Sequence, residues 1–257
     1  MVDRGLSAIV LAAGKGTRMR SELPKVCHPV GGRPMVCAVV DACLEAGCDR
    51  VVAVVGYRQE LVREALAPFG DAVSFAVQEE QLGTGHAVRC AAEHYAGAED
   101  EDVFVLCGDG PLIRPETLAG LLERHRSTGA VATLATATLD DPAGYGRVVR
   151  GPSGGFGRIV EQKNASAEEL EIREVNPSYY CFDARSLFGA LERVDRDEKS
   201  GEYYVTEAPA LLLAAGGRVE VIDAVPPEDV LSINTPEQLA EVDRVFRSRA
   251  IAGRDAR

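Results

Sequence analysis

Short apolar, β-branched runs alternate with helical patterns along the first half of this chain, and this alternation limits its fold more than any other feature. The runs are bounded by turn residues, and the stretches between them have the apolar period of helices. Strands are predicted over residues 8–13, 50–55, 73–77, 103–107 and 131–138, and helices over 35–46, 59–67, 85–95 and 115–127. Such alternation is typical of an α/β fold with a Rossmann-like, mostly parallel sheet and helices on both faces.

The second half of the chain has a different pattern. From about Gly144, short extended segments are separated by turn residues, at 146–149, 157–162 and 177–182. We interpret these segments as a small mixed β lobe that lies over the carboxyl edge of the sheet. Further elements are predicted as helices at 206–215 and 236–247 and a strand at 219–224.

Composition excludes several classes of protein. A formal net charge of −12 argues against nucleic acid as a partner, because duplex binding needs a broad basic face. Seven cysteines without a Cys-x-x-Cys pair argue against a disulfide framework or a structural zinc site. No apolar run approaches the length of a membrane span, and the N-terminus lacks the pattern of a secretory signal. We therefore expect no membrane partner and a cytoplasmic location.

A glycine-rich segment with three cations follows the first predicted strand. Gly14 and Gly16 allow a tight turn whose backbone N–H groups are open to anionic oxygens. Lys15, Arg18 and Lys25 add full positive charge, and a guanidinium can bind two phosphate oxygens at once. Although the chain is acidic overall, five cations oppose two carboxylates within residues 1–30. The segment therefore predicts a site for a nucleoside triphosphate.

Two commoner glycine loops do not match. A P-loop requires Gly-x4-Gly-Lys-Ser/Thr, whereas the glycines here are two residues apart. A dinucleotide-binding loop requires a small residue where this chain has Met19. An ordinary strand-to-helix turn would explain the glycines but not the neighbouring cations and proline. A second motif, Gly151-Pro-Ser153-Gly-Gly155, matches the nucleophile elbow of hydrolases, but it joins two extended runs and is predicted to be a hairpin tip.

The segment from Leu11 to Met19, followed by Pro24-Lys25, resembles the signature of the sugar-1-phosphate nucleotidyltransferases. More narrowly, the chain is similar to the uridylyltransferase part of the bifunctional N-acetylglucosamine-1-phosphate uridylyltransferases. The resemblance covers nearly the whole chain through further motifs at residues 78–87, 108–112, 140–147, 159–163, 201–204 and 234. The bifunctional members continue into a β-helix acetyltransferase domain with hexapeptide repeats, which this sequence lacks, so acetyl transfer is not expected.

The resemblance implies a nucleotide-diphospho-sugar transferase fold in one domain over residues 1–250. Its nucleotide-binding part spans about 1–112, its sugar-binding part, with the small β lobe, about 113–235, and its C-terminal helix about 236–250. The implied reaction is the magnesium-dependent transfer of UMP from UTP to N-acetylglucosamine 1-phosphate, which yields UDP-N-acetylglucosamine and pyrophosphate. Two alternatives stay open: another sugar 1-phosphate or base, or a catalytically silent regulatory protein that binds nucleotide sugars. The oligomeric state is not predicted.

This chemistry joins two anions and requires charge neutralisation and alignment rather than a protein nucleophile. Asp109 follows a predicted buried strand, so its carboxylate should lie at the carboxyl edge of the sheet, where open α/β sheets bind ligands. An aspartate before Pro111 could equally cap a turn. The resemblance favours Mg²⁺ binding by Asp109 and by the amide oxygen of Asn234, which could otherwise cap the helix that follows.

The remaining site residues are implied by the resemblance. Arg18 and Lys25 are expected to stabilise the transition state. The sugar phosphate is expected to contact Gly146, Glu161 and Asn176, with Lys163 as a further candidate for its phosphate; the sequence departs from the family where Pro177-Ser178 follow Asn176. The nucleotide is expected to contact Leu11, Ala12, Ala13, Gly14, Lys15, Gly16, Gln78, Gly83 and Thr84. His86 is interpreted as a helix-start residue.

Overall fold

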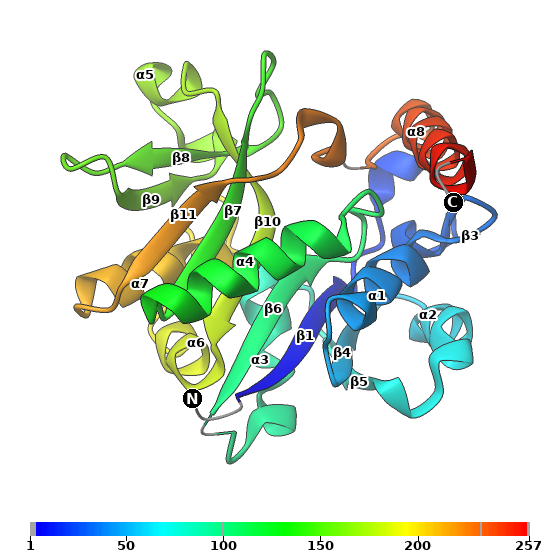
Figure 1. The fold of residues 1–257 in the computed structure, drawn as a ribbon, viewed down its shortest axis with the longest axis horizontal. Helices are drawn as coiled ribbons and strands as arrows, with labels where there is room; N and C mark the ends of the chain where they lie inside the picture. The colour runs from blue at the N-terminus through cyan, green and yellow to red at the C-terminus, as the bar shows by residue number, and fades with distance from the viewer. Residues whose placement is uncertain (1–3, 99, 232, 256–257) are drawn as a thin grey trace.

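The computed structural model describes residues 4–98, 100–231 and 233–255. Within these residues, a nine-stranded sheet has the order β11-β7-β10-β6-β1-β4-β5, with β8 and β9 attached beside β10 (Figure 1). The main strands are β1 (Gly5–Ala12), β4 (Arg50–Val55), β5 (Val73–Val77), β6 (Glu101–Cys107), β7 (Ala132–Thr138), β10 (Glu174–Asp183) and β11 (Val219–Asp223). The predicted α/β sheet is confirmed, and all its neighbouring pairs are parallel except those that involve β10 and the β8–β9 pair.

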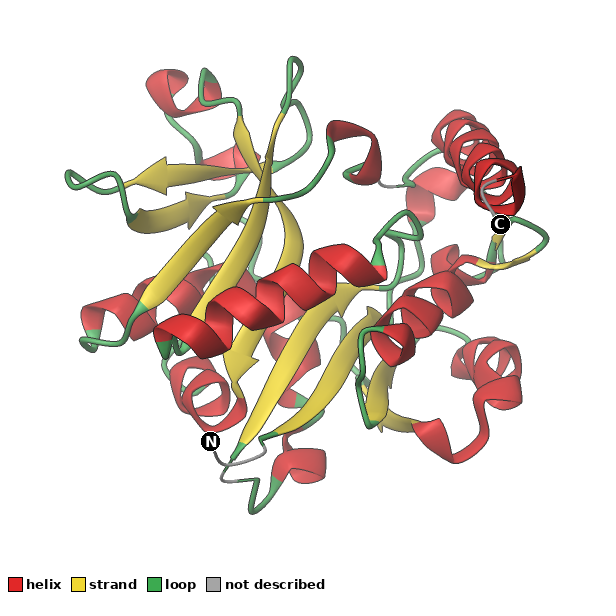
Figure 2. Cartoon of the chain, in the orientation of Figure 1, coloured by secondary structure: helices red, strands yellow, loops and turns green. Residues whose placement is uncertain are grey.

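Helices cover both faces of the sheet (Figure 2). One face is packed by α1 (Met35–Glu45), α2 (Gln59–Leu66) and α4 (Pro115–Thr128), and the other by α3 (Thr84–Arg89), α6 (Ala184–Leu191) and α7 (Ala208–Ala214). Strand β1 serves both layers, because Ala8 and Val10 enter one core and Ile9 the other. Burial on two faces explains why its sequence is a continuous apolar run rather than an alternating one.

The ends of α4 illustrate how local sequence sets these helices. Pro115 stands in the first turn, where its missing N–H costs nothing, and Gly129 ends the helix in the left-handed conformation, with φ 63°. Between them Leu118 and Leu121 are fully buried against the sheet. The loop between β6 and Pro115 is thereby held at the carboxyl edge of the sheet.

Strand β10 differs from its predicted placement. Residues 177–182 were expected in the small lobe, but β10 lies antiparallel in the main sheet, between β6 and β7. Tyr180, Cys181 and Phe182 are completely buried, which suits a central strand covered on both faces. The predicted lobe is therefore built from the opposite end of β10, where Asn176 pairs with Gly146 of β8.

The predicted helix at 85–95 is also wrong in its extent. Helix α3 ends at Arg89, and a separate 3-10 turn, η4 (Ala92–Tyr95), follows it. In this turn Tyr95 buries its ring against Phe188, with ring centroids 5.1 Å apart, and its hydroxyl lies 3.0 Å from Ser7 Oγ. This anchoring favours a tighter turn over a continued α-helix.

The small lobe contains the hairpin of β8 (Gly146–Arg150) and β9 (Phe156–Val160) and the short helix α5 (Ala167–Leu170). Its tip is closed by a hydrogen bond from Gly151 N to Gly155 O of 2.9 Å, so the Gly-x-Ser-x-Gly segment is a hairpin tip as predicted. The C-terminal helix α8 (Pro236–Asp255) is longer than predicted and packs on the hairpin of β2 (Pro29–Val30) and β3 (Arg33–Pro34).

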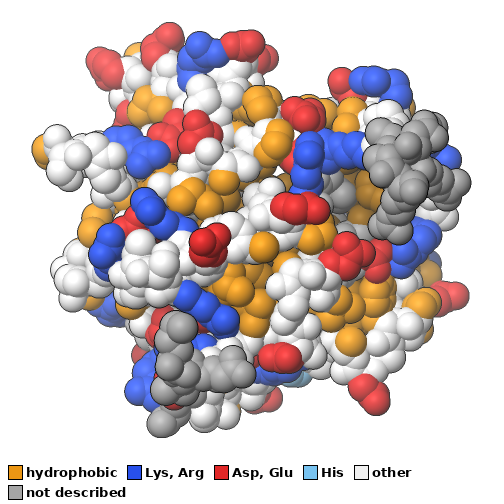
Figure 3. All heavy atoms as spheres, viewed as in Figure 1, with side chains coloured by type: hydrophobic (Ala, Val, Ile, Leu, Met, Phe, Trp, Pro, Cys, Tyr) orange, Lys and Arg blue, Asp and Glu red, His pale blue; other side chains and the backbone are white. Residues whose placement is uncertain are grey.

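The face in Figure 3 carries acidic and basic side chains intermixed, without a broad patch of one sign. No helix among the described residues is both long enough and apolar enough to span a bilayer. All seven cysteines are free, and five of them are buried.

A buried ion-pair cluster holds the amino edge of the sheet, opposite the predicted site. Asp102 is 1% exposed and accepts hydrogen bonds from Arg4 Nε at 2.9 Å and Arg126 Nε at 2.7 Å. Burial would raise the pKa of the Asp102 carboxyl, but the hydrogen bonds and charges of His125, Arg126 and Arg4 outweigh it and lower the pKa to about 2.

The Asp102 cluster predicts a specific loss of stability in acid. Because the folded-state pKa is depressed, the stabilisation is complete above pH ~4 and is lost as the pH falls toward 2. Between pH 5 and pH 2, the difference in unfolding free energy between the parent and Asp102→Asn should narrow by about 2 kcal/mol. Urea titrations at several pH values measure this difference. Asp140→Asn, at a fully exposed carboxylate, should show no narrowing, and a constant Asp102 difference would contradict the assignment.

Candidate active site

Two adjoining cavities open at the carboxyl edge of the sheet. One, of about 280 Å³, is lined mainly by the glycine-rich segment and Gln81. The other, of about 480 Å³, extends toward the small lobe. Arg18, Lys25 and Asn234 line both cavities and therefore lie at their junction. Residues that the sequence separates by more than 200 positions are thus brought together, as predicted for a two-substrate site.

The glycine-rich turn is shaped around Lys25. Gly16 has φ 69°, and a Cβ added there would lie 2.6 Å from Lys25 Cβ, so only glycine fits. The 3-10 turns η1 (Thr17–Met19) and η2 (Lys25–Cys27) then place Arg18 and Lys25 on the same side of the turn, at the junction of the cavities. The close approach explains why a glycine and a lysine nine residues apart belong to one structural unit.

Four side chains meet at this junction. The Lys25 ammonium donates to the Asp109 carboxylate and, at 2.9 Å, to Asn234 Oδ1. The Arg18 guanidinium donates to the same Asn234 oxygen at 2.7 Å. Asp109 reaches this place because β6 ends at Cys107 beside β1, where Gly108 N donates to Leu11 O at 2.9 Å. The structure therefore unites the two predicted catalytic cations with the two predicted metal ligands.

The donor set fits a hard divalent cation. A carboxylate oxygen of Asp109 and the amide oxygen of Asn234 converge on one positive group, the Lys25 ammonium. Such oxygens are the ligands that Mg²⁺ prefers, and Mg²⁺ commonly binds through one or two protein ligands plus substrate phosphates. Among the described residues, no group of three or more His, Cys, Asp or Glu side chains could hold a metal ion.

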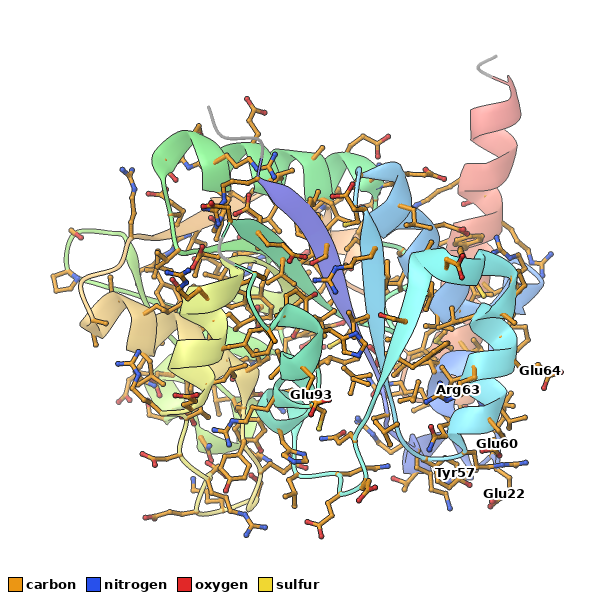
Figure 4. The ribbon with its side chains drawn as sticks, turned by 90° about the horizontal axis from the view of Figure 1, so that it is seen from below. Glu22, Tyr57, Glu60, Arg63, Glu64 and Glu93 are labelled. Carbon is orange, nitrogen blue, oxygen red and sulfur yellow. The ribbon has the colours of Figure 1, made fainter. Side chains whose placement is uncertain are left out.

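Lys15 is held at the outer rim of the smaller cavity. Its ammonium lies 5.0 Å from the centroid of the Tyr57 ring, a cation–π distance. The Tyr57 hydroxyl in turn donates to Glu22 Oε2 at 3.0 Å, and Figure 4 shows both side chains beside α2. Tyr57 N also donates to Ala13 O at 3.0 Å, so Tyr57 supports the glycine-rich segment through backbone and side chain.

Of the residues expected to bind the base, Gly14 lines the smaller cavity and Thr84 the larger one, whereas Gln78 and Gly83 line neither. Gln78 is buried, and its amide nitrogen donates to Gly83 O at 3.1 Å and lies 3.0 Å from His86 Nδ1. Gln81, which was not among the predicted site residues, lines the cavity and donates from Nε2 to Ala13 O at 2.9 Å. In this structure Gln78 therefore shapes the loop that follows β5, and its contact with a base remains a prediction.

The loop at Gly83 and Thr84 is joined to residues beside the larger cavity. Gly83 has φ 98°, and a Cβ there would lie 2.5 Å from Tyr203 O. Thr84 Oγ1 accepts from Val205 N at 3.1 Å, and Gly85 N donates to Tyr203 O at 2.8 Å. Residues 83–85 are thus hydrogen-bonded directly to residues 203–205, beside the larger cavity.

The larger cavity is lined by a half-buried acid, Glu161. Glu161 follows β9 and accepts a hydrogen bond from Thr206 Oγ1 at 3.0 Å. Burial raises the pKa of Glu161, and the Thr206 bond offsets part of that rise. Gly146 lies opposite Glu161. A Cβ placed on Gly146 would lie 3.1 Å from Ile159 Cγ2 and 3.9 Å from Glu161 Oε2. The missing side chain leaves room for a ligand next to an acceptor of hydroxyl hydrogen bonds.

Asn176 lines the same cavity but is already engaged. Its Nδ2 donates to the Tyr180 hydroxyl at 2.6 Å, and its Oδ1 accepts from Ser178 N at 3.2 Å. Ser178 has φ 65°, at the irregularity in β10 between Val175 and Tyr179. Asn176 therefore stabilises this bulge, and its carbonyl oxygen and its NH2 group each keep capacity for one further hydrogen bond.

Lys163 does not line either cavity. Its ammonium lies 4.9 Å from the centroid of the Tyr204 ring and 3.9 Å from Glu202 Oε2. Leu11 and Ala12 end β1 and Ala13 follows it, and none of the three lines either cavity. Sequence reasoning missed Thr206, Tyr179 and Gln238, which line the larger cavity; their places depend on long-range packing, and no motif marks them.

The fold and site are those of a nucleotidyltransferase. The family model of the MobA-like NTP transferase domain matches residues 8–210, and the chain belongs to this family. The chain is 48% identical over 244 residues to the bifunctional protein GlmU of Geobacter metallireducens, across 95% of this chain and 51% of that protein. It is also 48% identical over 242 residues to the bifunctional protein GlmU of Geobacillus thermodenitrificans, across 94% and 52% of the respective lengths. The chain thus spans about half the length of these curated relatives.

Solved structures support the fold. A UDP-glucose pyrophosphorylase complexed with UDP-glucose superposes with a TM-score of 0.75 at 17% identity, over 95% of this chain and 99% of that one. A putative glucose-1-phosphate thymidylyltransferase from Bacillus anthracis gives a TM-score of 0.77 at 18% identity, over 95% and 96%. At such low identity these matches establish the nucleotide-diphospho-sugar transferase fold alone.

Proposed function

We propose that this chain transfers UMP from UTP to N-acetylglucosamine 1-phosphate in a Mg²⁺-dependent reaction that releases pyrophosphate. The observation that carries the proposal is the junction of two cavities, where Lys25 and Arg18 converge on the oxygens of Asp109 and Asn234. The similarity to the GlmU proteins supports uracil and N-acetylglucosamine as the base and the sugar.

In the reaction a phosphate oxygen of the sugar phosphate attacks the α-phosphorus of UTP, and pyrophosphate leaves. Asp109 and Asn234 would hold Mg²⁺, which neutralises charge on the phosphate oxygens. Arg18 and Lys25 stabilise the negative charge that develops on the α-phosphoryl group and on the leaving pyrophosphate. The backbone N–H groups of Gly14 to Gly16 bind the terminal phosphates. These groups align two anions, and no side chain needs to act as a nucleophile.

The sugar phosphate would occupy the larger cavity. Glu161 accepts hydrogen bonds from sugar hydroxyls, while Gly146 leaves space for the ring. Asn176 contributes its remaining donor or acceptor. The uridine would lie toward Gln81 and the loop from Gln78 to Thr84, with its phosphates directed at the junction.

The proposal is tested by pyrophosphate release from four nucleoside triphosphates, each combined with a panel of sugar 1-phosphates. We expect Mg²⁺-dependent release that is fastest with UTP and N-acetylglucosamine 1-phosphate. A preference for another pair would replace the substrate assignment, and no release with any pair, from a protein that still binds UDP-N-acetylglucosamine, would favour the silent binding protein.

Replacement of Glu161 by glutamine should weaken sugar-phosphate use selectively. The variant keeps the shape of the side chain but loses the charge-assisted hydrogen bonds, so kcat/KM for the sugar phosphate should fall about tenfold. The KM for UTP should stay within about twofold, because Glu161 lies outside the triphosphate cavity. Steady-state kinetics with each substrate varied measure both values. Glu168→Gln, at an exposed glutamate of α5, is the control, and equal effects on both substrates would contradict the assignment.

A further inference from the structure

A second buried carboxylate lies behind the active site. Asp229 ends the 3-10 turn η7 (Pro227–Asp229), on the strap that joins β11 to α8 in Figure 1, and is 1% exposed. Arg114 binds it with two hydrogen bonds, from Nε to Oδ2 at 2.5 Å and from Nη2 to Oδ1 at 3.0 Å. Arg249 of α8 binds the same carboxylate. One acid is thus shared by two arginines that come from different parts of the chain.

Each contact of Asp229 leads to a segment that carries a predicted metal ligand. Arg249 also donates from Nη1 to Leu112 O at 3.0 Å, three residues beyond Asp109. The Tyr179 hydroxyl donates to Asp229 O at 3.1 Å, and the same hydroxyl would lie 3.4 Å from a Cβ on Gly110, the neighbour of Asp109. Asp229 itself lies five residues before Asn234.

A further hydrogen bond fixes the strap on the side of the small lobe. The Tyr145 hydroxyl donates to Val230 O at 2.9 Å. The strap is therefore bonded on successive residues by two tyrosines, one from β10 and one from the turn before β8. These bonds hold the backbone at Asp229 and Val230 to the sheet and to the small lobe.

We propose that Asp229 is a positioning residue that fixes the separation of the Asp109 and Asn234 oxygens. The inference rests on the proposed function, in which these oxygens hold Mg²⁺. Mg²⁺ demands near-ideal octahedral geometry at ~2.1 Å, so small displacements of a ligand weaken its binding. Asparagine at 229 keeps the size of the side chain but cannot neutralise Arg114 and Arg249, which are partly exposed and free to turn toward solvent. The loop of Asp109 and the strap of Asn234 would then move independently.

The chain offers a matched control for this proposal. Asp102 is also 1% exposed and is also bound by two arginines, Arg4 and Arg126. It lies at the amino edge of the sheet, away from both cavities of the active site. Loss of either carboxylate removes a buried ion-pair cluster, but only Asp229 is bonded to the segments of the predicted metal ligands.

The experiment compares the parent chain, Asp229→Asn and Asp102→Asn by calorimetric titration with UTP. Each protein is titrated with UTP twice, once in the presence of Mg²⁺ and once in the presence of a chelator. The ratio of the two dissociation constants for UTP gives the metal-dependent gain in affinity. We expect Asp229→Asn to lose about tenfold or more of this gain, in the range found for residues that orient metal ligands. Asp102→Asn should keep the gain within about twofold, although thermal unfolding should show both variants destabilised.

The outcomes separate this inference from the proposed function. A parent with no metal-dependent gain in UTP affinity would overturn the proposed function. If the parent shows the gain, two results would overturn the inference alone. One is an Asp229→Asn protein that retains the gain, and the other is an Asp102→Asn protein that loses as much of it as Asp229→Asn does. If Asp229→Asn does not fold, Arg114→Gln and Arg249→Gln replace it. Each should lose about threefold of the gain, and retention of the parental value by both would overturn the inference.

Discussion

Replacement of Asp109 by asparagine is expected to lower kcat by about a thousandfold or more. Among the described residues, Asp109 is the only one whose carboxylate binds Lys25 at the junction of the cavities. The substitution removes this carboxylate, which is the anionic ligand proposed for Mg²⁺. It changes no volume, so the fold should be retained, and a thermal unfolding scan checks this. Pyrophosphate release under saturating substrates measures the loss.

Asp140→Asn provides the comparison for Asp109, because its carboxylate is fully exposed and lies outside both cavities. This variant should turn over at the parental rate. An Asp109→Asn protein with a near-parental kcat would rule out Asp109 as an essential ligand.

Replacement of Lys25 by methionine should have two opposite effects. Loss of the ammonium from the transition state should lower kcat/KM for UTP by about 10² to 10³. In the absence of nucleotide, the same change should raise the affinity for a divalent cation, because Lys25 no longer occupies the oxygens of Asp109 and Asn234. Kinetics measure the first effect, and paramagnetic titration of the nucleotide-free protein with Mn²⁺ measures the second.

An exposed lysine, Lys199, serves as the matched control for Lys25. Lys199→Met should change neither quantity. If Lys25→Met weakened Mn²⁺ binding in the nucleotide-free protein, the view that the ammonium and the metal compete for the same oxygens would be wrong.

Much of the fold could be predicted because its signals are local. The strands β1, β4, β5 and β6 are apolar runs bounded by turn residues, and α4 carries its own start and stop signals at Pro115 and Gly129. The position of β10 could not be predicted in this way. Its apolar residues indicate a strand, but insertion between β6 and β7 depends on pairing with residues 36 to 81 positions away.

The site shows the same division between local and distant signals. Arg18 and Lys25 stand in a compact motif, and their convergence follows from the close approach of Gly16 and Lys25. Asp109 was predictable from its place after a buried strand. Asp229 carries no such signal, because it stands in no motif and its arginine partners come from distant parts of the chain.

The insertion of β10 has a consequence for how the protein acquires its structure. Strands β6 and β7 have no pairing with each other and meet only through residues 174–183. During synthesis, β7 and the part of the sheet formed by β6, β1, β4 and β5 would stay unjoined until β10 emerges from the ribosome. Until then, the edges of β6 and β7 would have unpaired backbone groups. A fragment ending near residue 170 should therefore aggregate rather than yield an independent nucleotide-binding unit, which makes this enzyme a poor candidate for division into separately expressed halves.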